Sequence, residues 1–95
     1  MKYLTLLAIF LLPLGAQAAQ DPETVFNRSC GICHNGQLKT APQKGDTAAW
    51  APRLDQGMDL LVERVISGYS VMPPRGLCSE CTPEDYKTVI EWMAQ

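Results

Sequence analysis

Residues 30–34 read Cys-Gly-Ile-Cys-His, and this string constrains the fold more than any other part of the chain. The pattern C-x-x-C-H is the attachment site of c-type haem. On a helical turn, Cys30 and Cys33 lie on one side, where their thiols can add to the two vinyl groups along one haem edge. His34 then presents an imidazole to the iron. The motif therefore predicts a chain folded around one covalently bound haem.

The first 18 residues have the features of a secretory signal peptide. Lys2 gives a basic start, residues 4–12 are almost continuously apolar, and Ala16 and Ala18 place small residues where a signal peptidase reads the chain. The apolar run is shorter than the roughly 20 residues of a membrane-spanning helix, although a retained anchoring helix is an alternative. We expect cleavage after Ala18, a periplasmic location, and no stable membrane insertion of the mature chain.

Cleavage would leave residues 19–95 as one small domain. A domain of this size buries only about 60% of its unfolded surface and is marginally stable alone, so such chains usually need disulfides, metals or other additions. Without Lys2 the chain carries seven basic and ten acidic side chains, a net charge of −3 that is scattered rather than clustered. This balance argues against a nucleic-acid partner, which requires a clustered basic footprint.

The first helix is predicted near the start of this domain. Asp21 followed by Pro22 provides a capping side chain and a first-turn proline, and the helix is expected to run to about Cys33. Residues 46–50 could form a single turn, which Pro52 would stop because proline cannot continue a helical hydrogen-bond ladder.

Two further helices follow, one over residues 58–67 and one beginning after Thr82. Each carries an apolar stripe at helical spacing. The two stripes consist of Leu61, Val62, Val65 and Ile66, and of Tyr86, Val89, Ile90 and Met93. No stretch alternates with period two, so the sequence predicts an all-α fold with three main helices, long loops and no sheet.

The second axial ligand of the iron cannot be another histidine, because His34 is the only one in the chain. The remaining soft candidates after residue 18 are Met58, Met72 and Met93. Met93 belongs to the stripe of the last helix and Met58 begins a helix, whereas Met72 lies in a loop before two prolines that restrict it to extended backbone. Met72 is therefore the expected distal ligand, and gap filling is its alternative role.

Histidine and methionine together fill both axial positions and raise the reduction potential relative to harder ligands. An iron with no vacant position has little reason to bind a substrate, yet it can pass electrons through the haem edge. The expected function is therefore a soluble electron carrier and not an enzyme. The alternative is an open-site haem protein, either a peroxidase or a gas-binding protein.

A second C-x-x-C pair, Cys78 and Cys81, allows a different interpretation. Together with Cys30 and Cys33 it could form a zinc-binding module. The export segment, the adjacent His34 and the methionine-proline loop argue against zinc. In an oxidising compartment Cys78 and Cys81 are then expected to form a disulfide, with a redox-active dithiol as the alternative.

With these residues placed, the chain resembles the class I c-type cytochromes, and most closely the cytochrome c-5 branch. The shared features are Phe26 four residues before the haem motif, an aromatic Trp92 in the last helix, and Met-Pro-Pro at residues 72–74 followed closely by Cys78 and Cys81. The resemblance implies the class I cytochrome c fold, in which the first and last helices cross with aromatic side chains at their contact.

The resemblance also implies contacts around the haem. Pro42 matches a proline whose carbonyl accepts the ring N–H of the axial histidine, here His34. Trp50 matches a tryptophan that packs on the haem and bonds a propionate, with Arg53 as a second donor. Plain core packing is the alternative for Trp50.

The expected partners are redox proteins. Electrons would come from a membrane quinol-oxidising complex or a dehydrogenase and pass to a terminal oxidase or reductase. A monomer or weak dimer is expected.

Overall fold

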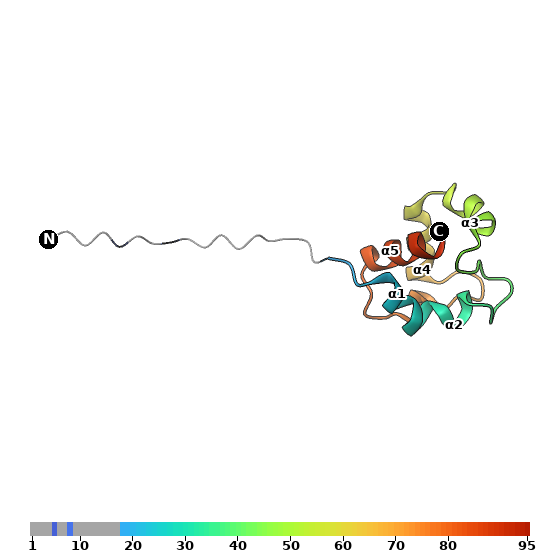
Figure 1. The fold of residues 1–95 in the computed structure, drawn as a ribbon, viewed down its shortest axis with the longest axis horizontal. Helices are drawn as coiled ribbons and strands as arrows, with labels where there is room; N and C mark the ends of the chain where they lie inside the picture. The colour runs from blue at the N-terminus through green and yellow to red at the C-terminus, as the bar shows by residue number, and fades with distance from the viewer. Residues whose placement is uncertain (1–4, 6–7, 9–17) are drawn as a thin grey trace.

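The computed structural model describes residues 5, 8 and 18–95. Nearly all of the predicted signal peptide therefore lies outside the described residues. Within the described part, no helix is long and apolar enough to cross a membrane. Helices and loops make up the body of the molecule, and the one β-type pairing among these residues is an isolated bridge between Tyr69 and Met72 (Figure 1). The prediction of an all-α fold without a sheet is confirmed.

The first helix is continuous but not regular. It consists of α1 (Pro22–Val25), a π-helical turn η1 (Phe26–Cys30) and α2 (Gly31–His34). The Asp21 carboxylate caps it by accepting a hydrogen bond from the Thr24 N–H at 3.0 Å, as predicted. The π turn is a feature that the sequence analysis did not anticipate.

Gly31 accommodates this wider turn. A Cβ at Gly31 would lie 2.9 Å from the carbonyl oxygen of Phe26 and 3.1 Å from its ring. Glycine therefore lets the Phe26 carbonyl and ring approach the helix backbone closely.

The expectation of a single turn stopped by Pro52 is wrong. Helix α3 (Thr47–Leu54) continues through Pro52 for two turns. The proline removes one hydrogen bond, and the helix tolerates this loss because Asp46 caps its start and the Asp55 N–H still bonds the Ala51 carbonyl at 3.1 Å. Residues 18–95 consequently contain a fourth helix beside the three that were predicted.

Helices α4 (Met58–Ser67) and α5 (Pro83–Met93) match the two remaining predictions. In α5, Thr82 and Asp85 form a reciprocal capping box, and all four residues of the predicted stripe are buried. In α4, Leu61 is buried and the other three stripe residues are partly buried against the core.

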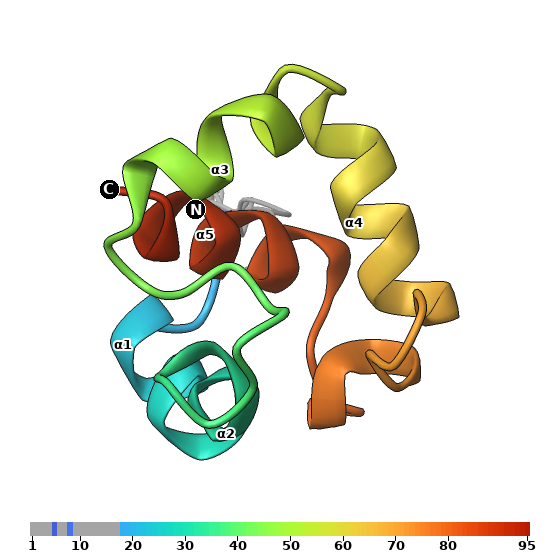
Figure 2. The ribbon, with the colours of Figure 1, turned by 90° about the vertical axis from the view of Figure 1, so that its right-hand side faces the viewer.

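Helix α5 is the centre of the packing. It contacts both α1 and α4, and α4 also packs on the short turn η2 (Pro74–Leu77). Figure 2 shows α1 and α2 below α5, with α4 to its right. At the crossing of the first and last helices, the rings of Phe26 and Trp92 lie 5.1 Å apart with tilted planes. This is the aromatic contact that the resemblance implied.

Candidate haem site

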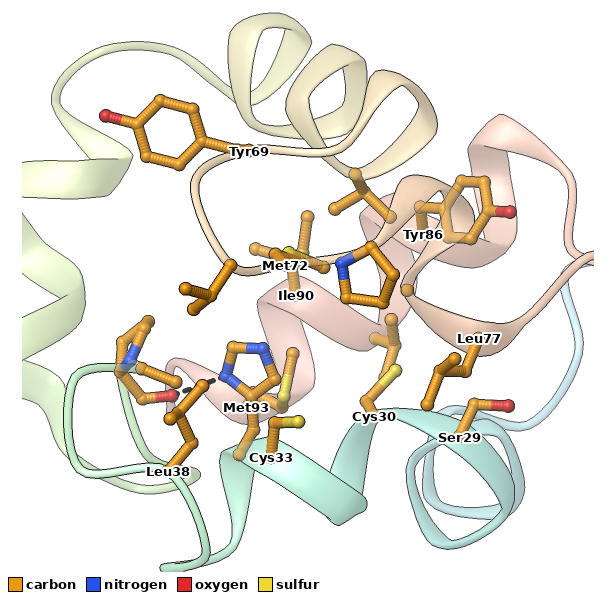
Figure 3. A pocket seen from close by; sticks show the side chains of 18 of the residues that line it. Ser29, Cys30, Cys33, Leu38, Tyr69, Met72, Leu77, Tyr86, Ile90 and Met93 are labelled. Carbon is orange, nitrogen blue, oxygen red and sulfur yellow. Dashed lines mark hydrogen bonds between the residues drawn. The ribbon is translucent and has the colours of Figure 1, made fainter.

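A cavity of about 230 Å³ lies between the first helix, α5 and the loop before α5. Cys30, Cys33 and His34 contribute to it from the first helix, and Met72 contributes from the loop. Figure 3 shows Met72 and Cys33 entering the cavity from opposite walls. The cavity therefore brings together the two thiols, the imidazole and the thioether that the sequence analysis selected.

The rest of the lining is mostly apolar. It includes the four stripe residues of α5, namely Tyr86, Val89, Ile90 and Met93. Its charged side chains are two arginines, Arg53 and Arg75, and no described carboxylate lines it. Apolar walls with two cationic groups suit a flat apolar ligand that carries carboxylates.

The imidazole of His34 is held in one orientation. It is buried, and its Nδ1 lies 2.6 Å from the Pro42 carbonyl oxygen. A carbonyl only accepts hydrogen bonds, so Nδ1 carries the proton and donates it. In the neutral ring the other nitrogen, Nε2, then keeps the lone pair that a metal requires. This contact is the one that the resemblance implied for Pro42.

Met72 is presented by a tightly constrained loop. The backbones of Tyr69 and Met72 exchange hydrogen bonds of 3.1 and 2.9 Å across a short turn. Three residues of this loop, Ser70, Arg75 and Leu77, have φ between 54° and 65°, and no other non-glycine residue of the described chain has positive φ. Left-handed backbone at these residues is strained, so the surrounding contacts must maintain this conformation.

Gly76 gives the Met72 side chain its space. A Cβ at Gly76 would lie 3.1 Å from the terminal methyl carbon of Met72. Among the other candidates, Met93 lines the cavity from the side of Cys33 (Figure 3), and Met58 packs partly buried against the core. Met72 is therefore the methionine that faces the cavity from the loop wall.

Cys30 and Cys33 are partly buried thiols that form no disulfide. Burial raises the pKa of the Cys30 thiol from its ordinary value, and a backbone hydrogen bond and the charge of Arg28 oppose this only in part. A protonated thiol is a poor metal ligand and a poor nucleophile. Burial of the Cys30 side chain thus favours the protonated thiol over the thiolate.

The four cysteines do not form a zinc site. Over the part of the chain that the structure describes, no group of three or more His, Cys, Asp or Glu side chains gathers as a metal site. Cys78 and Cys81 are joined instead by a disulfide, with Cα atoms 5.4 Å apart. This pair is followed by Thr82 rather than by histidine, so only Cys30 and Cys33 belong to a C-x-x-C-H motif.

The disulfide is embedded in a network that the sequence did not reveal. The Tyr86 hydroxyl donates to the Cys78 carbonyl at 2.6 Å, and Arg28 lies 3.6 Å from the Cys78 sulfur and 2.9 Å from the Glu80 carboxylate. Tyr86 was identified only as a core residue. These contacts tie the loop that carries Met72 to both the first helix and α5.

Trp50 and Arg53 lie in different surroundings. The Trp50 indole N–H donates to the Gln43 carbonyl at 2.9 Å, and its ring stacks on the His34 ring at 5.9 Å without lining the cavity. Arg53 does line the cavity, and one of its N–H groups donates to the Ala49 carbonyl at 2.6 Å. Contact of either residue with a propionate stays a prediction, and Arg53 is the better placed of the two.

Comparison with known proteins finds similar sequences and folds over most of this chain. Residues 17–93 match the family described as cytochrome c oxidase, cbb3-type, subunit III. Cytochrome c5 of Ectopseudomonas mendocina is 37% identical over 82 residues, which cover 84% of this chain and 91% of the relative.

Two solved structures are also similar. A mono-haem ferrocytochrome c from Shewanella putrefaciens has a TM-score of 0.71 and 45% identity, over 82% of this chain and 96% of that chain. A chain from an electron-transfer complex of nitrite reductase with cytochrome c has a TM-score of 0.70 and 32% identity, over 82% of this chain and all of that chain.

Proposed function

Because the chain belongs to the cytochrome c family of electron-transfer proteins, which carry covalently bound haem, we propose that it is a soluble periplasmic carrier with one haem ligated by His34 and Met72. Residues 1–18 would be its cleaved signal peptide and residues 19–95 its single domain.

The donor groups around the cavity fit this cofactor. The thiols of Cys30 and Cys33 would form the two thioether links, and Nε2 of His34 and the sulfur of Met72 would hold the iron. When bound, the haem supplies an iron that gains or loses one electron. The Pro42 carbonyl would keep the proton on Nδ1 and increase the basicity of the imidazole.

The observation that carries the proposal is the pairing of an oriented imidazole with a thioether across one apolar cavity. Such a ligand pair leaves no open position on the iron. The alternative, a peroxidase or gas-binding protein, requires an open position, and no observation on this chain favours it.

Electrophoresis under denaturing conditions followed by haem staining tests the attachment. The wild-type protein, matured in a host that attaches c-type haem, should stain at the position of the chain. The variant with Cys30→Ala and Cys33→Ala should not stain, whereas the one with Cys78→Ser and Cys81→Ser should. Absence of stain from the wild type would refute the proposal.

Carbon monoxide distinguishes the carrier from the open-site alternative. The ferrous wild type should not bind this gas rapidly at neutral pH, because Met72 would occupy the distal position. Met72→Ala should bind it. Equally rapid binding by both proteins would favour the open-site function.

The partners are proposed to be redox proteins, with a membrane quinol-oxidising complex as donor and a terminal oxidase or reductase as acceptor. The similarity to a cytochrome c solved in complex with nitrite reductase supports a reductase partner. Arg53 and Arg75 at the cavity favour contact with an acidic surface. Sedimentation of the purified protein should show a monomer or a weak dimer.

A further inference from the structure

Gln43 lies in the loop between α2 and α3, and its side-chain amide joins three separate points of that loop. Its Nε2 donates to the Leu38 carbonyl at 2.9 Å and to the Ala41 carbonyl at 2.7 Å. Its Oε1 accepts a hydrogen bond from the Gly36 N–H. Three of the four hydrogen-bonding positions of the amide are therefore used within one loop that contains no helix.

The two residues that flank Gln43 both bond His34. On one side the Pro42 carbonyl accepts from His34 Nδ1 at 2.6 Å, and on the other side the Lys44 N–H donates to the His34 carbonyl at 2.9 Å. The Gln43 carbonyl also accepts the Trp50 indole N–H. The position of Gln43 thus determines where the groups that hold His34 can lie.

We propose that Gln43 is a positioning residue for the axial histidine, acting through Pro42. Its amide braces the loop so that the Pro42 carbonyl stays on Nδ1 of His34, which fixes both the orientation and the basicity of the imidazole. The inference rests on the proposed function, because the basicity of His34 matters when it binds iron.

Two substitutions of Gln43 separate the effect of its side-chain hydrogen bonds from the effect of its side-chain volume. Gln43→Glu keeps the size and an acceptor for Gly36, but it loses both donors and places negative charge against two carbonyls. Gln43→Leu loses all three hydrogen bonds. Gln37→Leu and Gln37→Glu are the matched controls, because Gln37 is an exposed glutamine of the same loop.

The experiment uses the haem-loaded protein in its reduced state. Nuclear magnetic resonance measures how fast the Nδ1 proton of His34 exchanges with water, and a redox titration measures the reduction potential. Both Gln43 variants should speed this exchange at least tenfold. Gln43→Leu should also raise the reduction potential, since a weaker hydrogen bond makes the imidazole a poorer donor to ferric iron, whereas the negative charge added by Gln43→Glu favours ferric iron and opposes that rise. Both Gln37 variants should match the wild type.

Thr82→Ala controls for a general loss of stability. It removes the N-terminal cap of α5, and this cap lies outside the loop of Gln43. It should lower the melting temperature without changing the exchange rate or the potential. Gln43 variants that lose stability but keep wild-type exchange and potential would overturn the proposal. Loss of the fold in Gln43→Glu alone would also overturn it, because the amide would then serve the fold and not the histidine. Absence of haem from the wild type would instead refute the proposed function.

Discussion

The carboxylate of Asp85 connects the segment before α1 to the start of α5. It accepts hydrogen bonds from the Gln20 backbone N–H at 2.7 Å, from the Gln20 side chain at 2.9 Å and from the Thr82 N–H at 2.8 Å. Burial raises the pKa of Asp85, but the hydrogen bonds from Thr82 and Gln20 outweigh it and lower the pKa to about 2. The charged form of Asp85 is therefore the one that the fold stabilises.

This shift predicts a specific loss of stability in acid. The pKa of Asp85 is lower in the folded protein than its ordinary value of 3.8, so its contribution is fully present above about pH 4 and is lost as the pH falls toward 2. The contribution is about 2 kcal/mol. Urea unfolding at a series of pH values should show a shallower acid loss for Asp85→Asn than for the wild type. Parallel curves would contradict this assignment.

The close contact between Gly76 and the Met72 side chain leads to a prediction for a larger residue at position 76. Gly76→Ala should cost about 1–2 kcal/mol, because it places a side chain in left-handed backbone, and its Cβ should also displace the Met72 methyl group. The weak red absorption of iron–thioether bonding in the oxidised protein should then decrease. Gly57→Ala is the control, since Gly57 has φ of 99° and no neighbouring atom lies within 4 Å of the place that its Cβ would take. It should lose stability with an unchanged spectrum, and equal spectral changes in both variants would contradict the prediction.

At the scale of elements, the disulfide holds the loop of Met72 to the start of α5. Closing so short a loop contributes about 2 kcal/mol by the chain-entropy estimate. The variant with Cys78→Ser and Cys81→Ser should keep its haem and melt at a lower temperature. A reductant should lower the melting temperature of the wild type toward that of the variant and leave the variant unchanged. An unchanged melting temperature in the variant would refute the stabilising role.

The elements that the sequence predicted well are those with local signals. Asp21 and Thr82 mark helix starts, and the stripe of α5 repeats at helical spacing. The length of α3 was missed because the cap by Asp46 and the hydrogen bond from Asp55 to Ala51 offset the bond lost at Pro52. Whether these contacts outweigh a proline cannot be read from the residue types alone. The π turn was missed because its cause is the close approach of Phe26 to Gly31.

In the candidate site, too, the residues with a local sequence signal were predicted, and a residue that acts through tertiary contacts was not. Cys30, Cys33, His34 and Met72 could be found from a motif, a count and a proline pair, and the structure places them around one cavity. The role of Gln43 could not be found in this way. A glutamine in a loop carries no sequence signal for three hydrogen bonds to the backbone around it, because those contacts exist only after the loop has folded.

At the scale of the whole molecule, the cavity occupies the position of a core. Its mostly apolar lining includes four buried residues of α5, so a haem bound there would bury apolar surface that a domain this small needs for its stability. The variant with Cys30→Ala and Cys33→Ala, isolated without haem, should therefore lose cooperative unfolding and much of its helical circular dichroism. A sharp unfolding transition like that of the wild type would contradict this expectation.

The charge distribution predicts how the molecule reacts with small ions. The chain is acidic overall, with a formal net charge of −2 before any cleavage, yet arginines border the cavity. Arg75→Glu should slow oxidation by the anion ferricyanide several-fold at low salt, and high salt should remove the difference. Lys87→Glu, an equal change of charge at an exposed position of α5, should have a smaller effect. Equal slowing by both variants would contradict a local role for Arg75.

An optical redox titration of the purified wild-type protein tests the central claim most directly, because it observes the cofactor, its ligands and its electron transfer together. The account predicts one reversible transition with a one-electron slope of about 59 mV per tenfold change in the ratio of oxidised to reduced protein, and iron–thioether absorption in the oxidised form. A protein without visible absorption, or one whose spectrum does not respond reversibly to the applied potential, would contradict it.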